Sequence, residues 1–198
     1  PPFGPLDLYG VVFERGGPGV VVDALMMVGA FARTLLRFDP GHWAGQVAAR
    51  APDLLVFWMG GNDAVQDAVG FSRGRFVDGY AAAIAAARRG RPEASCLVVS
   101  VLDSGERDEV GRARTQPRVP RVVAAQREVA ERTGCAFYDL FRAVGGEGTM
   151  ARWVREASPR VSGDLKHLTP RGAHHVGHLL ERALLRSYDA WLEDRSED

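Results

Sequence analysis

Two residues near the C-terminus have the types and the spacing of an acid–base pair. Asp164 stands three residues before His167, in a short loop ahead of a helix whose start Thr169 and Pro170 predict. Hydrolysis by a nucleophile requires an imidazole to accept a proton and a carboxylate to hold that imidazole's tautomer. At this spacing the carboxylate can reach the ring Nδ1, which leaves the other ring nitrogen to react. The alternative is that Asp164 and Thr169 only cap the helix.

Asn62 and Gly29 each follow an apolar run and are candidates for contacts with an oxyanion. Asn62 stands in Gly-Gly-Asn-Asp directly after the run 53–59, and a side-chain amide there can donate to a developing negative charge. Gly-Asn-Asp is also a favoured turn sequence. A glycine at 29 either lets a backbone N–H approach a ligand or permits a positive φ. We expect Gly60 and Gly61 to line the substrate site beside Asn62.

The elements that must position these residues follow from the hydrophobic pattern. Strands are predicted at residues 19–27, 53–59, 95–102 and 136–140, and helices at 30–37, 42–50, 76–89, 119–133, 149–157 and 170–192. Apolar strands that alternate with helices indicate a parallel sheet covered on both faces, a three-layer α/β/α sandwich of the α/β class. Ligands then bind beyond the carboxyl ends of the strands. The charged stretch 103–120 is interpreted as a long surface loop.

Taken in order, these motifs resemble those of the SGNH, or GDSL-type, hydrolases. The pattern is Val-Asp-Ala-Leu-x-x-x-Gly-Ala, then Gly-x-Asn-Asp after a strand, then Asp-x-x-His-x-Thr-x-x-Gly before a C-terminal helix. Gly29 matches the second block of the family, Asn62 with Gly60 the third, and Asp164 with His167 the fifth. The resemblance implies a flavodoxin-like domain with a Ser-Asp-His triad. In it, His167 is the base, and the oxyanion hole combines the serine N–H, the Gly29 N–H and the Asn62 amide.

The nucleophile of that family is missing from its expected place. The first block, a Gly-Asp-Ser motif that ends the first strand, is absent from the sequence. Ser104, in Leu-Asp-Ser-Gly, comes nearest, but no glycine precedes its aspartate and its strand matches a later one of the family. Either the serine belongs to a segment outside this sequence, or it was lost and the domain only binds. We expect the first, so that the sheet lacks its first strand and the chain alone is inactive.

More narrowly, the chain is similar to bacterial two-part SGNH proteins related to peptidoglycan O-acetylesterases. By this resemblance residues 1–18 return from an upstream or inserted module of the same polypeptide, and residues 19–198 form the hydrolase-like domain. The implied reaction is hydrolysis of a small acyl ester, such as acetyl on an O-acetylated polysaccharide, with no metal or organic cofactor. The alternatives are a non-catalytic carbohydrate-binding or scaffolding domain, and a lipase-like or thioesterase-like acyl hydrolase.

The composition is that of one globular domain and excludes some partners. The chain has 198 residues, of which 46% are hydrophobic and 25% charged. Its 25 Lys and Arg equal its 25 Asp and Glu, so no net charge favours nucleic acid or an anionic membrane. The arginines of residues 107–121 are mixed with acids and lack aromatic neighbours, which favours a solvated loop. No apolar run approaches the roughly 20 residues of a membrane helix.

Histidines and cysteines leave two further questions. His174 and His178 are one helical turn apart, as in some zinc sites, but Val176 and Gly177 stand between them without the glutamate of a zinc hydrolase, so no metal is expected. Cys96 begins one predicted strand and Cys135 precedes another. If these strands are neighbours, the thiols can form a bridge, which suits an exported protein. Two buried free thiols are the alternative. The family resemblance favours a periplasmic or extracellular location.

Overall fold

The computed structural model describes residues 12–14, 16–65 and 70–196. Its elements are the 3₁₀ helix η1 (Ala32–Arg37), α1 (Pro40–Arg50), β1 (Leu54–Phe57), α2 (Gly61–Val65), α3 (Arg73–Arg88), β2 (Ser95–Val99), β3 (Gly105–Arg107), β4 (Ala113–Thr115), α4 (Val119–Thr133), β5 (Ala136–Tyr138), α5 (Leu140–Ala143), α6 (Thr149–Trp153) and α7 (Pro170–Ser196). The long predicted helices are confirmed, with shifts at their ends. Two ends have clear causes: the Asp39 carboxylate accepts from the His42 N–H at the start of α1, and Gly134, at φ 67°, ends α4.

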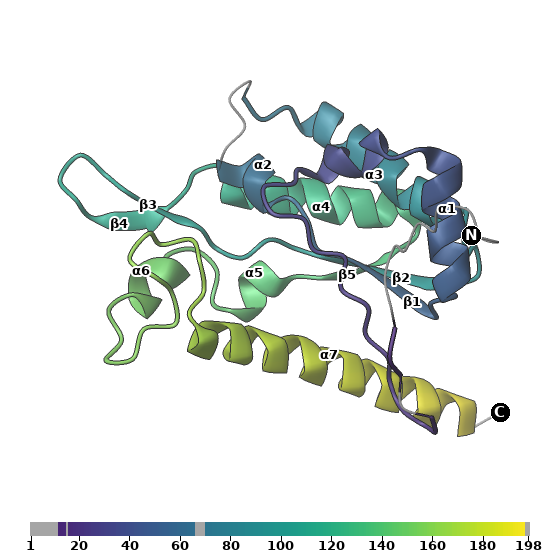
Figure 1. The fold of residues 1–198 in the computed structure, drawn as a ribbon. Helices are drawn as coiled ribbons and strands as arrows, with labels where there is room; N and C mark the ends of the chain where they lie inside the picture. The colour runs from purple at the N-terminus through teal and green to yellow at the C-terminus, as the bar shows by residue number, and fades with distance from the viewer. Residues whose placement is uncertain (1–11, 15, 66–69, 197–198) are drawn as a thin grey trace, which may run out of the picture.

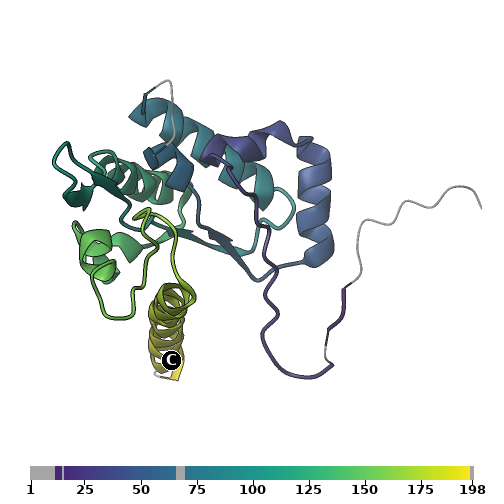
Figure 2. The ribbon, with the colours of Figure 1, turned by 60° about the vertical axis from the view of Figure 1, so that its left-hand side comes forward.

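The central sheet has three parallel strands in the order β1-β2-β5. Leu54 lies level with Ser95, and Leu97 with Ala136. Helices α1, α3 and α4 lie on one side of the sheet and α7 on the other, as Figures 1 and 2 both show. The predicted three-layer α/β/α fold is therefore confirmed, with α3 and α4 as the crossovers that parallel strands require.

The middle strand, β2, separates two hydrophobic cores. Cys96 and Val98 pack into a core shared with α3 and α4. Leu97 and Val99 point the other way, into a core with α5, α6 and the first half of α7. All four are at most 7% exposed. This is why the sequence of β2 is an unbroken apolar run: side chains alternate between faces, and both faces are covered.

Strand β1 is covered on one face only. Leu55 and Phe57 belong to the core with α3, but Leu54 and Val56 are 40% and 45% exposed on the side of α7. The second half of α7 also leaves apolar side chains exposed on its surface. We call these α7 side chains and the two exposed side chains of β1 the uncovered apolar residues: Leu54, Val56, Leu184, Leu185, Tyr188, Trp191 and Leu192. Exposed apolar side chains that form one contiguous patch often mark a surface that binds another protein segment.

The prediction of a strand at residues 19–27 is wrong. These residues have no regular secondary structure, and their apolar side chains are exposed, for example Val20 at 91% and Met26 at 86%. Figure 2 shows the segment extending away from the two helical layers. A strand needs a neighbour to satisfy its backbone N–H and C=O groups. No strand of the described chain pairs with this segment.

The prediction of one long loop at residues 103–120 is also wrong. Strands β3 and β4 form an antiparallel hairpin there, with Glu106 level with Arg114. The turn between them is held by Asp108, whose carboxylate accepts from the N–H groups of Val110 and Arg112. Each strand has only three residues and mostly polar side chains, so hydrophobic alternation could not reveal it.

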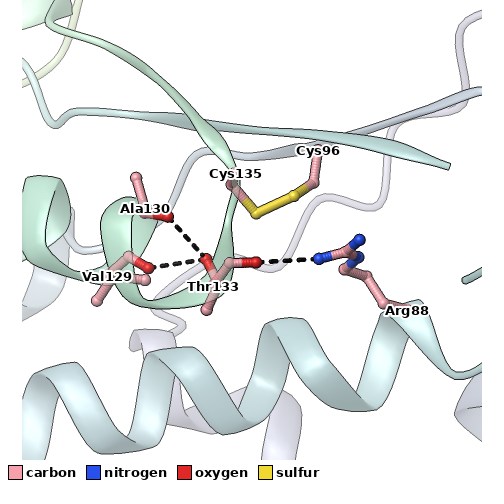
Figure 3. The surroundings of a disulfide bond; sticks show 6 residues. All are labelled: Arg88, Cys96, Val129, Ala130, Thr133 and Cys135. Atoms are coloured by element: carbon pink, nitrogen blue, oxygen red, sulfur yellow. Dashed lines mark hydrogen bonds between the residues drawn. A yellow bond between two sulfur atoms is a disulfide. The ribbon is translucent and has the colours of Figure 1, made fainter. Parts of the chain in front are cut away.

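A disulfide joins the starts of β2 and β5. Cys96 and Cys135 are bonded, with their Cα atoms 4.8 Å apart, beside the ends of α3 and α4 (Figure 3). The guanidinium of Arg88 donates to the Thr133 carbonyl oxygen in the same place. The two cysteines are therefore a bridge and not free thiols. It lies at the amino ends of the strands, away from the edge where ligands bind in such sheets. None of the described helices is long and apolar enough to cross a membrane.

Candidate active site at the carboxyl edge of the sheet

The Asp164 and His167 side chains face each other directly. Asp164 Oδ2 lies 2.5 Å from His167 Nδ1. Its Oδ1 accepts from the backbone N–H groups of Lys166 and His167, at 3.0 and 3.1 Å. The hydrogen bond to His167, followed by that from the Lys166 N–H, lowers the pKa of Asp164 to about 2. The carboxylate is thus held ionised, and it fixes which ring nitrogen of His167 faces it.

The other ring nitrogen of His167 is open to solvent. The His167 side chain is 82% exposed, and within the described chain no hydrogen bond reaches its Nε2. An imidazole oriented by a carboxylate at one nitrogen and open at the other can accept a proton there.

The loop that carries this pair is anchored to the start of β3, in the segment that follows β2. The Gly105 N–H donates to the Leu165 carbonyl oxygen at 2.7 Å, and a Cβ on Gly105 would lie 2.7 Å from the Leu165 Cβ. Leu165 itself is 1% exposed, with a positive φ of 62°. A bridge between Val161 and Leu168 closes the loop. The Asp164–His167 pair is consequently fixed to the carboxyl edge of the sheet, although it lies far along the chain from β2.

Asn62 and Asp63 form a second anchored group, in the short helix α2 after β1. Asn62 Nδ2 donates to the Ala30 carbonyl oxygen at 2.8 Å. Asp63 Oδ2 accepts from the Ala32 N–H at 3.0 Å, and Asp63 is only 4% exposed. The two side chains therefore hold the segment 30–32, which directly follows Gly29. One hydrogen bond leaves the second N–H of the Asn62 amide for another acceptor.

The three glycines of the prediction lie around Asn62 in different settings. Gly29 sits in an exposed turn at φ 73°, and no atom lies within 4 Å of a Cβ built on it. Gly60 is buried at φ 110°, and a Cβ there would lie 3.3 Å from Gln126 Nε2 and 3.4 Å from the Phe76 ring. Gly61 is exposed at the start of α2. Of Gly60 and Gly61, only Gly61 is open to a ligand in this structure.

Two buried polar residues beneath this edge were not found from the sequence. Gln126, on α4, is 0% exposed and contacts the ends of both β1 and β2. Asp103 is 2% exposed, and its Oδ2 accepts from the Met150 N–H at the start of α6. In the sequence, Gln126 is a glutamine on the apolar face of a predicted helix, and Asp103 is an aspartate directly after a predicted strand. Neither pattern is specific.

Ser104 directly precedes the residue that anchors the histidine loop, and within the described chain it is not hydrogen-bonded to the histidine. It precedes Gly105, which donates to Leu165. Among the hydrogen bonds of the described residues, none joins the Ser104 hydroxyl to the ring of His167. The structure thus joins His167 to its carboxylate and places the Asn62 amide after β1, and within the described chain no serine is hydrogen-bonded to His167.

On α7, His174 and His178 contact each other, and His178 also contacts a glutamate. The rings of His174 and His178 are 4.4 Å apart, edge to face, and His178 Nδ1 lies 2.9 Å from Glu181 Oε2. In the described part of the chain, no three histidine, cysteine or acidic side chains are grouped as a metal site requires.

Comparison with solved structures supports the fold. The chain is similar to a peptidoglycan O-acetylesterase (TM-score 0.72, 19% identity, 82% of this chain and 45% of that chain). It is also similar to a carbohydrate esterase of family 3 from Talaromyces cellulolyticus (0.57, 18%, 82% and 70%). A third similar structure is a catalytic mutant of an acetylxylan esterase from Geobacillus stearothermophilus (0.51, 20%, 80% and 67%). The chain spans less than half the length of the first of these.

The family follows from the sequence as a whole. No curated protein matches the chain. The sequence model of the GDSL-like lipase/acylhydrolase family matches residues 6–175, which is most of the chain and includes the edge that carries Asn62, Asp164 and His167. With a parallel α/β/α fold shared with solved esterases, this chain belongs to the GDSL-like lipase/acylhydrolase family.

Proposed function

We propose that this chain is the base-bearing and oxyanion-binding part of a serine esterase that removes acetyl groups from an O-acetylated carbohydrate. The observation that carries the proposal is the Asp164–His167 pair, 2.5 Å apart at the carboxyl edge of the sheet, on the same edge as the amide of Asn62. A base and an oxyanion donor at one sheet edge are what acyl transfer requires.

In this proposal each group has one role. His167 Nε2 takes the proton of a serine hydroxyl, whose oxygen attacks the ester carbonyl carbon. The Asn62 amide and the Gly29 N–H stabilise the oxyanion, and Asp164 stabilises the imidazolium. The alcohol leaves with the proton of His167, and an acetyl-serine ester is formed. Water then attacks that ester by the same route, which releases acetate and restores the serine.

The substrate class rests on the similar structures and on the disulfide. The similar proteins are esterases named for peptidoglycan O-acetyl groups and for acetylxylan. The Cys96–Cys135 bridge suits an oxidising compartment, where such polymers occur. We therefore place the protein in the periplasm or outside the cell, with residues 1–18 as the return from another module of the same polypeptide. The proposed chemistry uses no metal or cofactor.

The open side of the sheet is where the nucleophile belongs in this proposal. Among the described strands, β1 pairs only with β2, so its other edge has free backbone groups. Leu54 and Val56 are exposed beside that edge. A further parallel strand there would pair with β1, cover these side chains and end at the same edge as Asn62. A serine at the end of that strand would meet His167, and residues 19–27 would gain a partner for pairing.

The test is an esterase assay of this chain and of the intact natural polypeptide. We expect the intact protein to hydrolyse p-nitrophenyl acetate faster than long-chain esters and to release acetate from O-acetylated polysaccharide. The His167→Ala variant should lose at least about a hundredfold in kcat, and the chain alone should be inactive. The Ser104→Ala variant is the control and should keep full activity.

Each other outcome points to a different function. Loss of activity in Ser104→Ala would move the nucleophile into this chain. A preference for long acyl chains would indicate a lipase-like or thioesterase-like enzyme. A folded intact protein without esterase activity, but with affinity for the polysaccharide, would establish the non-catalytic binding domain.

A further inference from the structure

Gln126 connects the ends of two strands at the active edge. It lies on α4 and is 0% exposed. Its Nε2 donates to the Met59 carbonyl oxygen at 2.7 Å and lies 3.4 Å from the Val99 carbonyl oxygen. Its Oε1 accepts from the Val101 N–H at 2.9 Å. The amide thus spans the points at which the chain leaves β1 and β2.

These partners fix the orientation of the amide without ambiguity. One end faces an N–H donor and the other faces carbonyl acceptors, so only a neutral group with a donor and an acceptor satisfies both. Glutamate offers two acceptors when ionised, and methionine offers neither function. A buried backbone group left without its partner costs about 1–3 kcal/mol.

Asn62 lies three residues beyond the carbonyl that Gln126 holds. Gly60 packs against the amide, since a Cβ on it would lie 3.3 Å from Nε2. The Gly60 carbonyl oxygen then accepts from the Ala64 N–H at 3.0 Å, which closes the first turn of α2. The position of Met59 and Gly60 therefore sets the position of α2 and of the Asn62 amide.

We infer that Gln126 is a positioning residue for the oxyanion donors, acting through Met59 and Gly60 on Asn62. The effect of Gln126 on catalysis rests on the proposed function. The effect of Gln126 on the position of Asn62 can be measured in this chain alone. A general loss of stability would not give the same pattern, because the Gln126 side chain is hydrogen-bonded to Met59 and Val101, whereas the Val129 side chain contributes only apolar atoms to the core.

The test compares Gln126→Met and Gln126→Glu with Val129→Ala. Val129 is also 0% exposed on α4 and packs only in the hydrophobic core, so its variant reports a general loss of stability. The first readout is amide hydrogen exchange of this chain. In Gln126→Met the Val101 and Ala64 amides should exchange at least about tenfold faster than in Val129→Ala. In Gln126→Glu the Val101 amide should stay protected from exchange, whereas the Ala64 amide should exchange faster than in the wild type.

The second readout is the kinetics of the esterase-active polypeptide. Gln126→Met should lower kcat about tenfold or more and change KM less than about twofold, because an oxyanion donor acts mainly in the transition state. Val129→Ala should keep its kcat. Equal exchange in Gln126→Met and Val129→Ala would overturn the inference, and so would an unchanged kcat with altered exchange. If the wild-type polypeptide has no esterase activity, the proposed function fails, and the exchange data still decide whether Gln126 holds Asn62.

Discussion

At the scale of single residues, the pair of Asp164 and His167 is held by short local contacts. Three interactions within four residues converge on one carboxylate, and the chain supplies them by closing the loop between Ser162 and His167. The pair needs no distant side chain to form. This locality explains why the spacing of the two residues already indicated that the carboxylate can reach the ring, with helix capping as the alternative.

The pKa of Asp164 offers a test that does not depend on catalysis. Its value of about 2 lies below the ordinary 3.8, chiefly because of the hydrogen bond with His167. We expect the pKa of Asp164 to rise toward 3.8 in the His167→Ala variant, as measured by NMR titration of the carboxyl carbon. The His178→Ala variant is the control, because His178 pairs with Glu181 instead.

The sign of the accompanying stability change follows from linkage. A carboxyl whose pKa is lowered by folding stabilises the protein above its unfolded pKa. The stability difference between wild type and His167→Ala should therefore be fully present above pH 3.8 and shrink as the pH falls toward 2. A difference that stays constant across this range would contradict the assigned cause. Because both side chains are largely exposed, we expect the difference to be small.

At the scale of elements, the start of α7 depends on one close backbone contact. A Cβ on Gly172 would lie 1.9 Å from the Arg160 carbonyl oxygen, whereas nothing lies within 4 Å of a Cβ on Gly177 in the same helix. The Thr169 N–H also donates to the Arg160 carbonyl oxygen. The segment before α7 carries Asp164 and His167. It can therefore pack closely against the start of α7 because position 172 has no side chain.

The substitution Gly172→Ala tests this contact. It should lower the free energy of unfolding by about 1–3 kcal/mol, as overpacking does, and reduce esterase activity by moving the histidine loop. Gly177→Ala should be neutral or stabilise the protein by up to about 1 kcal/mol, because alanine favours helix. Chemical denaturation of both variants measures the difference. Equal effects at the two positions would show that the contact with Arg160 has no consequence.

The disulfide is the second element-scale feature, because it ties the sheet where the helices α3 and α4 end. Cys96 and Cys135 are 39 residues apart in sequence, and a bridge of this span stabilises by about 2–4 kcal/mol in the chain-entropy account. The Cys96→Ala, Cys135→Ala double variant should lose that amount in denaturant titrations. A reducing agent should destabilise the wild type by a similar amount and leave the double variant unchanged; a wild type insensitive to reduction would refute this expectation.

At the scale of the whole molecule, the sheet is covered unevenly. The face of β1 toward α7 and the second half of α7 leave the uncovered apolar residues exposed, and residues 19–27 pair with no described strand. All three features have the same physical meaning. Apolar surface and backbone groups are exposed to water, and a further strand would remove them from water. In the proposed function, the sheet edge that carries Asp164 and His167 supplies the base, and the open side beside β1 would receive the strand that carries the serine.

The substitution Val56→Lys distinguishes an exposed surface from a docking surface. In this chain alone Val56 is 45% exposed, so the change should alter stability by about 0.5 kcal/mol or less. In the intact polypeptide a covering strand would bury the lysine, and the cost should exceed about 2 kcal/mol. Val110→Lys, at a residue 72% exposed in the β3–β4 turn, is the control and should be neutral in both. The same small effect of Val56→Lys in both proteins would exclude a strand at this edge.

Local patterns in the amino-acid sequence were enough to predict several features of this chain. The apolar runs of β1 and β2, the amphipathic α4 and the Asp164–His167 motif each depend on residues close together in the chain, and the structure has all of them. The parallel α/β/α class followed from the order of those elements.

Other features depend on residues that are distant in the chain and become visible only once the chain is folded. Residues 19–27 have the composition of a strand, but a strand exists only when another strand pairs with it. The pairing of Cys96 with Cys135 required β2 and β5 to be adjacent. The place of Gln126 between β1 and β2 required α4 to pack over both strand ends. The disulfide and the hydrogen bonds of Gln126 join residues that are far apart in the chain, so they depend on packing that no local sequence pattern specifies.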